Sequence, residues 1–262
     1  MNMFDLTNKY ALVTGATGYL GKEIALALAS TGAHVLINSR TKLKCDALVN
    51  EILCKGYKAS SASFDVTDHN AVDEFISNLQ LDHIDIIVNN SYAGGAGSVE
   101  LSSSEAYRSA YDSSLVSSAH LFTATLPLLR EAVRRNGYAS VINIASMYGM
   151  VSPDQRIYDS MSVVNPPFYG SAKAALIYWT KYAGCEFAKE NIRINCISPG
   201  PFPSMQVQNT APKLVGKITS KVPMGRVGRA NEIAGPVVFL ASSASSFMVG
   251  ANIPVDGGWT CW

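Results

Sequence analysis

Tyr169 and Lys173 are the residues of this sequence whose types and spacing most directly suggest acid–base chemistry. They belong to the segment Tyr-Gly-Ser-Ala-Lys, which follows Pro166-Pro167, and proline suits the first turn of a helix. Residues four apart on a helix project from the same face, so the two side chains should be neighbours. A nearby ammonium favours the ionised form of a phenol, whose pKa in water is about 10. We therefore expect Lys173 to lower the pKa of Tyr169 and to make it a general acid and base.

Ser146 is the third candidate for the same chemistry. It ends the apolar run 142–146, which is typical of a buried strand, and its hydroxyl would polarise a substrate oxygen by hydrogen bonding. By themselves, Tyr169 and Lys173 would more simply be an ordinary surface pair, because Tyr-x-x-x-Lys is a common chance pattern. The catalytic interpretation therefore depends on whether the rest of the sequence supplies a cofactor site.

A glycine-rich turn after the first strand-like run predicts that cofactor site. In the segment Thr14-Gly-Ala-Thr-Gly-Tyr-Leu-Gly21, Gly15 allows a tight turn, Gly18 a close approach to a pyrophosphate, and Gly21 close packing of helix on strand. The free N–H groups at the helix start would bind the phosphates, helped by the helix dipole. The alternative is an ordinary turn between a strand and a helix. The residues expected to contact the dinucleotide here are Gly15, Thr17, Gly18, Tyr19 and Leu20.

The end of the second strand bears on which dinucleotide binds. NAD sites usually carry an acid there, which binds the 2′-hydroxyl of the adenosine ribose. This chain has Ser39 and Arg40 instead, and an arginine can bind a 2′-phosphate through two hydrogen bonds. We therefore predict NADP(H) in preference to NAD(H), although Arg40 could also be a solvated loop charge. Asp65 and Val66, after the third strand, would hold the adenine, or Asp65 would cap a helix.

These residues need a scaffold that brings strand ends together, and strand-like apolar runs alternate with helical segments along the chain. The expected strands are 10–14, 34–38, 60–64, 84–89, 139–146, 192–198 and 251–255. The expected helices are 21–30, 42–55, 70–80, a long one within 105–135, 168–189 and 231–242. Short runs rich in Val and Ile, apolar on both faces, indicate parallel strands buried on two sides. We therefore predict an α/β protein with a doubly wound, parallel seven-stranded sheet flanked by helices (a Rossmann fold), in a single domain over 1–262.

Composition narrows the class of protein. Of the 262 residues, 48% are hydrophobic and 16% are charged, and the net charge is +1, which argues against a large surface for nucleic acid or anionic lipid. The sequence contains no run of 18 apolar residues, so we expect no membrane span, and the N-terminus shows no signal-peptide pattern. The five cysteines are odd in number and lack metal-site spacing, as in a reducing compartment. We expect a cytoplasmic protein that needs no metal and acts on a small molecule.

Taken together, these motifs resemble those of the short-chain dehydrogenase/reductase family over nearly the whole chain. The motifs, in order, are the glycine turn, Asp65-Val66, Asn89-Asn90, Ser146, Tyr169 with Lys173, Asn195-x-x-x-Pro-Gly200 and Val255-Asp-Gly-Gly258. The resemblance implies hydride transfer on a nicotinamide at a Ser–Tyr–Lys site, with Lys173 also binding the nicotinamide ribose. It further implies that Pro199, Gly200 and Phe202 flank the nicotinamide and that Asn89 supports the strand on the cofactor side.

Three motif positions depart from the family pattern. The spacing G-x-x-G-x-x-G is that of a longer, sugar-nucleotide branch, with Tyr19 where the short branch has glycine. Ser91-Tyr92 replaces Ala-Gly, so Tyr92 could intrude on the pocket or the cofactor. Ser114 stands where the family's asparagine holds a water of a proton relay, and we include it among the catalytic candidates because it could still hold that water.

The stretch between Ser146 and Tyr169 is longer than is usual in the family, with 23 residues from one to the other. We expect an insert at about 147–166 to form part of the pocket wall and a lid at about 200–222 to set substrate choice. Arg156 would suit a phosphate or carboxylate, or the insert is a packing or subunit-contact loop. The insert is locally similar to bacterial surface-sugar and flagellin-modification oxidoreductases and to gluconate 5-dehydrogenase-like reductases. The candidates for contact with a polar substrate are Tyr148, Asp154, Arg156 and Tyr158.

The function predicted from these features is an NADP(H)-dependent oxidoreductase that interconverts a ketone and a secondary alcohol, on a polar or sugar-derived substrate. Two alternatives stay open. One is a dinucleotide-binding regulator that has lost turnover, and the other is a sugar-nucleotide epimerase or dehydratase. The family also implies a homotetramer or homodimer formed through the two longest helices. The candidate contact residues, unless the monomer buries them, are Tyr178, Trp179 and Tyr182.

Overall fold

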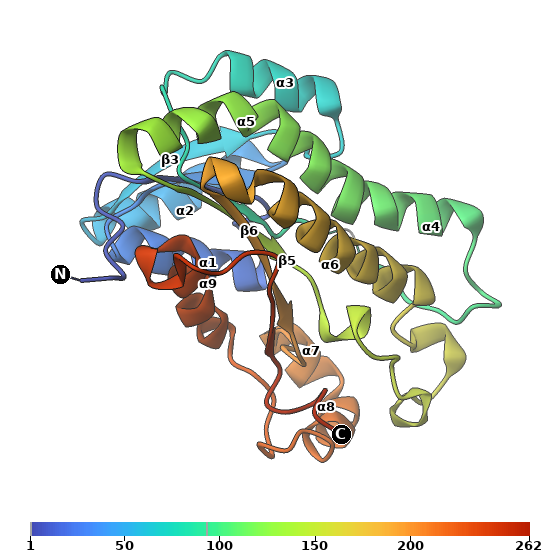
Figure 1. Ribbon diagram of the computed structural model, residues 1–262. Coiled ribbons are helices and arrows are strands. Elements are labelled where there is room, and N and C mark those ends of the chain that lie inside the picture. The colour runs from blue at the N-terminus through green and yellow to red at the C-terminus, as the bar shows by residue number, and fades with distance from the viewer. Residues whose placement is uncertain (1, 93) are drawn as a thin grey trace.

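A single sheet of seven parallel strands organises the computed structural model, which describes residues 2–92 and 94–262 (Figure 1). The strands are β1 (Tyr10–Val13), β2 (His34–Ser39), β3 (Lys58–Ser63), β4 (Ile86–Asn89), β5 (Ala139–Ile144), β6 (Ile192–Pro199) and β7 (Asn252–Val255). Their order in the sheet is β3-β2-β1-β4-β5-β6-β7. The order reverses beside β1, and in doubly wound sheets ligands bind beyond the strand ends at that point. The predicted fold class is confirmed.

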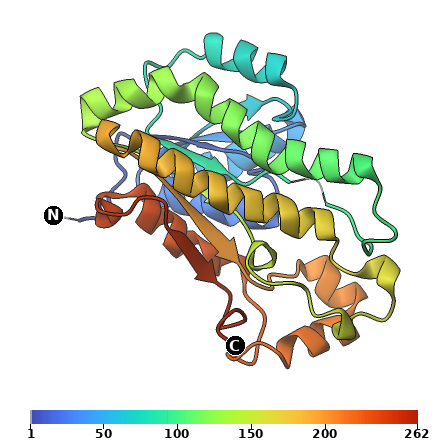
Figure 2. The same cartoon turned by 45° about the vertical axis from the view of Figure 1, so that its right-hand side comes forward.

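Helices cover both faces of the sheet (Figures 1 and 2). One face carries α1 (Tyr19–Ser30), α2 (Lys42–Cys54) and α9 (Ala234–Ala241). The other carries α3 (His69–Ser77), α5 (Ser117–Asn136) and α6 (Pro167–Phe187), with α4 (Ser104–Tyr111) packed against α6. Two short helices, α7 (Met205–Thr210) and α8 (Pro212–Thr219), follow β6 and lie beyond its carboxyl end.

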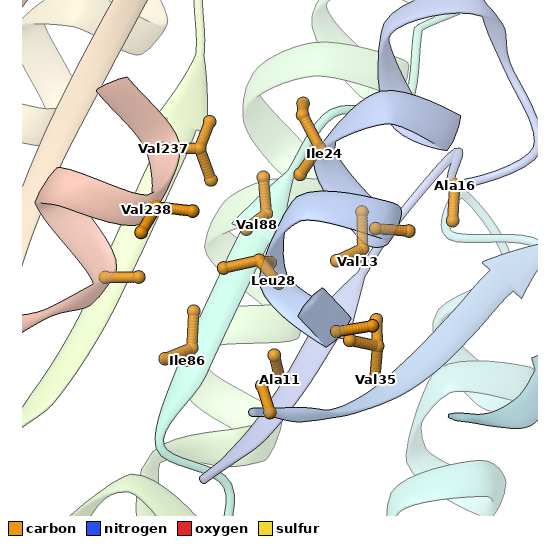
Figure 3. Packing of buried hydrophobic residues seen from close by; sticks show 14 of the residues in the cluster. Ala11, Val13, Ala16, Ile24, Leu28, Val35, Ile86, Val88, Val237 and Val238 are labelled. Carbon is orange, nitrogen blue, oxygen red and sulfur yellow. The ribbon is translucent and has the colours of Figure 1, made fainter. Parts of the chain in front are cut away.

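The core between α1, α9 and the sheet fixes the start of α1 (Figure 3). Val13 of β1 and Val88 of β4 are fully buried, and Ile24 and Leu28 of α1 pack in the same cluster. Val237 adds the contact from α9. Because burial of apolar surface is the main driving force of folding, this cluster holds α1 rigidly behind the end of β1.

The long helix expected within 105–135 is interrupted. Between α4 and α5 the chain forms a π-helical turn, Asp112–Val116. Serine hydroxyls bind backbone carbonyls at this point: Ser117 Oγ donates to Ser113 O at 3.0 Å, and Ser118 Oγ donates to Ser114 O at 2.6 Å. Such side-chain bonds compete with regular helix bonds, and π-turns are frequent at functional sites.

The remaining element bounds lie within a few residues of those expected. The last helix begins with a 3₁₀ turn, Ala230–Ile233, before α9. In the described part of the chain, no helix has the length and apolarity needed to cross a bilayer. Over the same residues, no three side chains of metal-ligating type come together.

Candidate active site

A cavity of about 720 Å³ opens where β1, β2, β4, β5 and β6 end. This volume lies in the usual range for ligand pockets. Most of the predicted site residues line it: Gly15, Thr17, Gly18, Tyr19, Leu20, Ser39, Arg40, Asp65, Val66, Ser146, Tyr169, Lys173, Pro199, Gly200 and Phe202. The fold thus collects into one cavity side chains that are far apart in the sequence.

The glycine turn leaves its backbone open to a ligand. Gly15 has φ 57°, a conformation that favours glycine, and a Cβ at Gly21 would collide with the Gly15 carbonyl. No side chain caps the first N–H groups of α1, whose N-cap residue is Gly18. Uncapped N–H groups at a helix start form a site for an anion. The turn therefore fits the pyrophosphate of a dinucleotide.

Asn90 holds this turn and was not among the predicted site residues. Its side-chain amide donates to Thr14 O at 3.1 Å and to Gly15 O at 3.2 Å. Its backbone N–H donates to Thr14 Oγ1 at 2.9 Å. The end of β1 is thereby fastened to the end of β4. The pair Asn89-Asn90 drew attention in the sequence, but only the structure shows that the second asparagine faces the turn.

Asn89 itself does not line the cavity, contrary to its expected place among the cofactor-binding residues. It is buried, and its amide donates to Asn143 Oδ1 of β5 at 2.8 Å. Asn143 in turn donates to Thr180 Oγ1 of α6 at 2.8 Å. Because side chains alternate in direction along a strand, Asn89 points into the interior of the protein and not into the cavity. Its hydrogen bond to β5 supports β4 on that side.

The adenosine end of the cavity is formed by the ends of β2 and β3. Asn38 donates to Ala62 O at 2.8 Å and to Phe64 O at 3.1 Å, which keeps the two strand ends together. Arg40 is exposed at the cavity, and among the described residues it forms no ion pair, so its guanidinium remains available to an anion. Asp65 accepts hydrogen bonds from Thr67 N at 3.0 Å and from its Oγ1 at 2.8 Å. The residue that caps α3 is Asp68.

The nicotinamide end expected from the sequence lies where β6 ends. The Gly200 N–H donates to Val255 O at 2.9 Å, and a Cβ on Gly200 would collide with Asp256. Asp256 accepts from Gly258 N and Thr260 N, each at 2.9 Å, and so closes the turn after β7. The backbone around Pro199 and Gly200 is therefore fixed from the C-terminal side.

Ser146, Tyr169 and Lys173 come together at the centre of the cavity. Ser146 follows β5, and its Oγ accepts the N–H of Tyr148 at 3.1 Å. Tyr169 and Lys173 belong to the first turns of α6, which begins at Pro167, and Lys173 is only 3% exposed. Its Nζ donates to Ile144 O at 2.7 Å. The helix start predicted from the two prolines is confirmed.

The electrostatics of this group differ from the expectation. Burial lowers the pKa of Lys173 to about 8. Burial also raises the pKa of Tyr169, and the nearby Ser146 hydroxyl only partly opposes this. The expected lowering of the Tyr169 pKa, by Lys173 together with the charge of an oxidised nicotinamide, stays a prediction for the complex; in the protein by itself this pKa is raised. The reason is that both groups are removed from water, while Lys173 Nζ lies 5.9 Å from the centre of the phenol ring.

Tyr92 stands against this group, as its bulk suggested. Its ring lies edge-to-face with that of Tyr169, with centroids 4.7 Å apart. Lys173 Nζ lies over the Tyr92 ring, 5.4 Å from its centroid. The side chain that replaces the family's glycine is therefore part of the cavity wall beside the two central residues.

Ser114 does not line the cavity, and its expected part in a proton relay, as the residue that holds a water, stays a prediction. It is buried on the π-helical turn, and its hydroxyl has no partner within the described residues. Its carbonyl accepts the hydroxyl of Ser118. The neighbouring Asp112 and Ser113, on the same π-helical turn, do line the cavity.

The insert packs against the lid. Met147 and Ile157 of the insert share an apolar cluster with Val222 and Trp259, and Leu214 and Ile218 of α8 pack on it. Ion pairs join the same segments: Lys217 to Asp159 at 2.7 Å, and Lys221 to Asp154. Tyr148 and Tyr158 place their hydroxyls 3.4 Å apart. The predicted wall function of the insert therefore remains a proposal, with the lid as its immediate neighbour.

Arg156 does not line the cavity that holds Ser146, Tyr169 and Lys173. Its side chain is 86% exposed and pairs with Asp154 at 2.9 Å. Both residues line a separate cavity of about 410 Å³, together with Lys221, Trp259 and Trp262. The expected contact of Arg156 with an anionic substrate at the redox site therefore finds no support in the geometry.

Other lining residues carried no recognisable signal in the sequence. They are Phe64, Thr67, Glu105, Ser109, Asp112, Ser113, Ile144 and Ala145. Most follow a strand or face the cavity from α4, and their types are common on any surface. Only the arrangement of the helices in space identifies them.

Comparison with known proteins agrees with this geometry. Residues 15–260 match the family model described as enoyl-(acyl carrier protein) reductase. The gluconate 5-dehydrogenase of Gluconobacter oxydans is 30% identical over 264 residues, which cover 99% of this chain and 97% of that protein. A tropinone reductase homolog of Arabidopsis thaliana is 31% identical over 262 residues, covering 98% and 94%.

The same similarity holds in three dimensions. The crystal structure of a gluconate 5-dehydrogenase from Burkholderia cenocepacia, in complex with NADP and tartrate, matches with a TM-score of 0.88 at 27% identity. The match covers 100% of this chain and 98% of that one. Sequence motifs, strand order, cavity and relatives agree over the full length. The chain belongs to the short-chain dehydrogenase/reductase family and is an NAD(P)-dependent oxidoreductase.

Proposed function

We propose that this protein uses NADP(H) to interconvert a ketone and a secondary alcohol on a polar, sugar-derived substrate. The observation that carries the proposal is the position of Tyr169. Its phenol lies in the dinucleotide cavity beside Ser146, with the buried Lys173 one helical turn further on. A proton donor and a hydrogen-bond donor thus face the same space, which is what a reacting carbonyl oxygen needs.

Tyr169 and Ser146 divide the chemistry between them. A bound nicotinamide supplies or accepts the hydride, and its oxidised form brings a positive charge into the cavity. In the reducing direction the Tyr169 hydroxyl gives its proton to the carbonyl oxygen, while Ser146 holds that oxygen in place. Burial raises the pKa of Tyr169, so the phenol keeps its proton at neutral pH and is ready to act as the acid. In the oxidising direction the phenolate form of Tyr169 would take the proton of the alcohol, and the positive charge of the oxidised nicotinamide would favour that form.

Arg40 supports the choice of NADP(H). Its guanidinium is exposed at the adenosine end of the cavity, next to Ser39, and no carboxylate follows β2 to bind a ribose 2′-hydroxyl. Among the structural relatives, the Burkholderia enzyme is described with bound NADP. We propose that Arg40 binds the 2′-phosphate through charge-assisted hydrogen bonds.

The substrate class rests on two supports. Two relatives are named gluconate 5-dehydrogenases, which are enzymes of a sugar acid. The insert packs against the lid, and within the insert Tyr148 and Tyr158 place their hydroxyls 3.4 Å apart. We propose that these hydroxyls bind a hydroxyl of the substrate, since polar groups that converge on a pocket fix ligand orientation.

A substrate panel tests the proposal. Purified protein is mixed with NADPH or NADH and with keto-sugar acids, cyclic ketones, a 3-oxoacyl thioester or an enoyl thioester. NADPH oxidation with a keto-sugar acid, reduced roughly 10²- to 10⁴-fold in Tyr169→Phe, is the expected result. Turnover of the enoyl thioester alone would replace ketone reduction by C=C reduction, in line with the description of the matching family model.

A regulatory protein without turnover is the second candidate, and Tyr92 favours it. The ring fills space beside Tyr169 that the family leaves to glycine. NADPH binding without turnover on any member of the panel, unaffected by Tyr169→Phe, would support this alternative.

We also propose a homo-oligomer in the cytoplasm. Tyr178 and Tyr182 of α6 are 69% and 64% exposed, whereas Trp179 packs inside the monomer on Phe122. The expected contact face thus keeps two of its three aromatic residues on the surface. Light scattering of the purified protein should give a mass of two or four chains, reduced by Tyr178→Glu. A single-chain mass would contradict the proposal.

A further inference from the structure

Tyr92 has a position that the reaction outlined above does not use. It follows β4, and its ring contacts both central residues: edge-to-face with Tyr169 at 4.7 Å and beneath the Lys173 ammonium at 5.4 Å. The two contacts come from α6, on which Tyr169 and Lys173 lie one turn apart. One aromatic ring therefore touches both members of the pair.

The surroundings of Lys173 make this contact significant. The residue is buried, and its ammonium donates a hydrogen bond to the Ile144 carbonyl of β5. Within the described residues it forms no ion pair, and burial is the cause of its lowered pKa. The Tyr92 and Tyr169 rings lie beside the ammonium, with centroids 5.4 Å and 5.9 Å from Nζ. The other titratable groups of the cavity are Tyr19, Arg40, Asp65, Glu105 and Asp112. Tyr169 also contributes to the raised pKa of Tyr148 in the insert.

The Tyr92 hydroxyl does not explain why the side chain stands there. It is buried and has no hydrogen-bond partner among the described residues. Burial raises the pKa of this phenol, so it stays neutral and contributes no charge. The interactions of Tyr92 with its neighbours are therefore made by its ring. The face of an aromatic ring carries partial negative charge and attracts a cation within about 6 Å.

We propose that Tyr92 is a positioning residue of the redox site, whose ring keeps the Lys173 ammonium charged and close to Tyr169. The inference rests on the proposed function, because a charged Lys173 is useful there only if Tyr169 exchanges a proton. The ring supplies the electrostatic partner that no carboxylate of the described chain supplies. It also covers the ammonium, so that water does not replace the contact with Tyr169.

Two substitutions separate the ring from its hydroxyl. Tyr92→Phe keeps the ring, and Tyr92→Leu keeps an apolar side chain without the negative ring face. The pKa of Lys173 is measured by its ¹⁵Nζ chemical shift in protein labelled with ¹⁵N-lysine, with Lys173→Met to assign the signal. Tyr92→Leu should lower this pKa by about 0.4 to 1.5 units, the range for a cation–π contact. Tyr92→Phe should leave it within about 0.3 units of the original protein.

The pH dependence of turnover gives the second readout. In Tyr92→Leu the alkaline limb of kcat/KM for ketone reduction should shift to lower pH by the same amount as the Lys173 pKa. In Tyr92→Phe it should stay where it is in the original protein. A Lys173 pKa that is unchanged or raised in Tyr92→Leu would overturn the proposal. So would an equal effect of both substitutions, which would assign the role to the hydroxyl.

The two measurements also distinguish this inference from the proposed function. The nuclear magnetic resonance titration needs no substrate, so a lowered Lys173 pKa without turnover would refute the redox function and leave the ring–ammonium contact intact. Turnover by the original protein, with a Lys173 pKa that is unchanged in Tyr92→Leu, would refute the ring–ammonium contact and leave the redox function intact. Circular dichroism of both variants verifies that each is folded before it is titrated.

Discussion

Replacing Lys173 by methionine should change how the stability of the protein depends on pH. Burial lowers the pKa of this ammonium from 10.5 to about 8. Between these two values the unfolded chain holds the proton and the folded protein does not, so folding becomes more favourable as the pH rises. At 1.36 kcal/mol per pKa unit the full gain is about 3 kcal/mol, of which about 2 kcal/mol falls between pH 7 and pH 10.

Methionine has a similar length, fills irregular spaces and carries no charge, so Lys173→Met removes this gain with little change in packing. Urea unfolding at pH 7 and pH 10 gives the free energy of unfolding of both proteins. The free energy of unfolding of Lys173→Met, relative to the original protein, should fall by about 2 kcal/mol from pH 7 to pH 10. Groups that titrate in both proteins cancel in this comparison. The reasoning would be refuted if the difference between the two free energies of unfolding did not change with pH. It would also be refuted if the free energy of unfolding of Lys173→Met rose with pH relative to that of the original protein.

Further substitutions test other parts of the site. Arg40→Gln should weaken NADPH binding roughly 10- to 100-fold and NADH binding little, because a charge-assisted bond is lost, with Lys44→Gln as control in a fluorescence titration. Equal losses for both dinucleotides would argue against a 2′-phosphate site. Gly21→Ala should destabilise the protein by about 1–3 kcal/mol and abolish dinucleotide binding, since its Cβ collides with the glycine turn. Gly235→Ala, whose Cβ meets nothing within 4 Å, should be neutral or slightly stabilising in thermal unfolding. Arg156→Ala should change kcat and KM by less than about twofold, because this exposed side chain pairs outside the redox site; a tenfold rise in KM would show that it reaches the substrate.

The sheet was accessible from the sequence because its strands are buried on both faces. Runs such as 11–13 and 35–37 are apolar without alternation, and glycines mark the first turn between strand and helix. The start of α6 followed from Pro166 and Pro167, because proline suits the first turn of a helix; the helix begins at Pro167, with Pro166 as its N-cap. These are local signals, and local signals suffice for element order and for the placement of Ser146, Tyr169 and Lys173.

The pKa shifts at the site and the break in the long helix could not be predicted from local signals. The pKa directions of Tyr169 and Lys173 depend on burial by segments far away in the sequence. At the π-helical turn, the hydroxyls of Ser117 and Ser118 donate hydrogen bonds to backbone carbonyls and not to water. The orientation of Arg156 depends on its pairing with Asp154 in the folded insert. Each of these is a property of tertiary contacts.

A crystal structure of the protein with NADP⁺ tests the central claim most directly. The account predicts the pyrophosphate at the N-terminus of α1 and the nicotinamide ring within contact distance of the Tyr169 hydroxyl. It also predicts the adenosine 2′-phosphate beside Arg40. A nicotinamide bound elsewhere, or a Tyr169 hydroxyl directed away from it, would contradict the assignment of this phenol as the group that moves the proton.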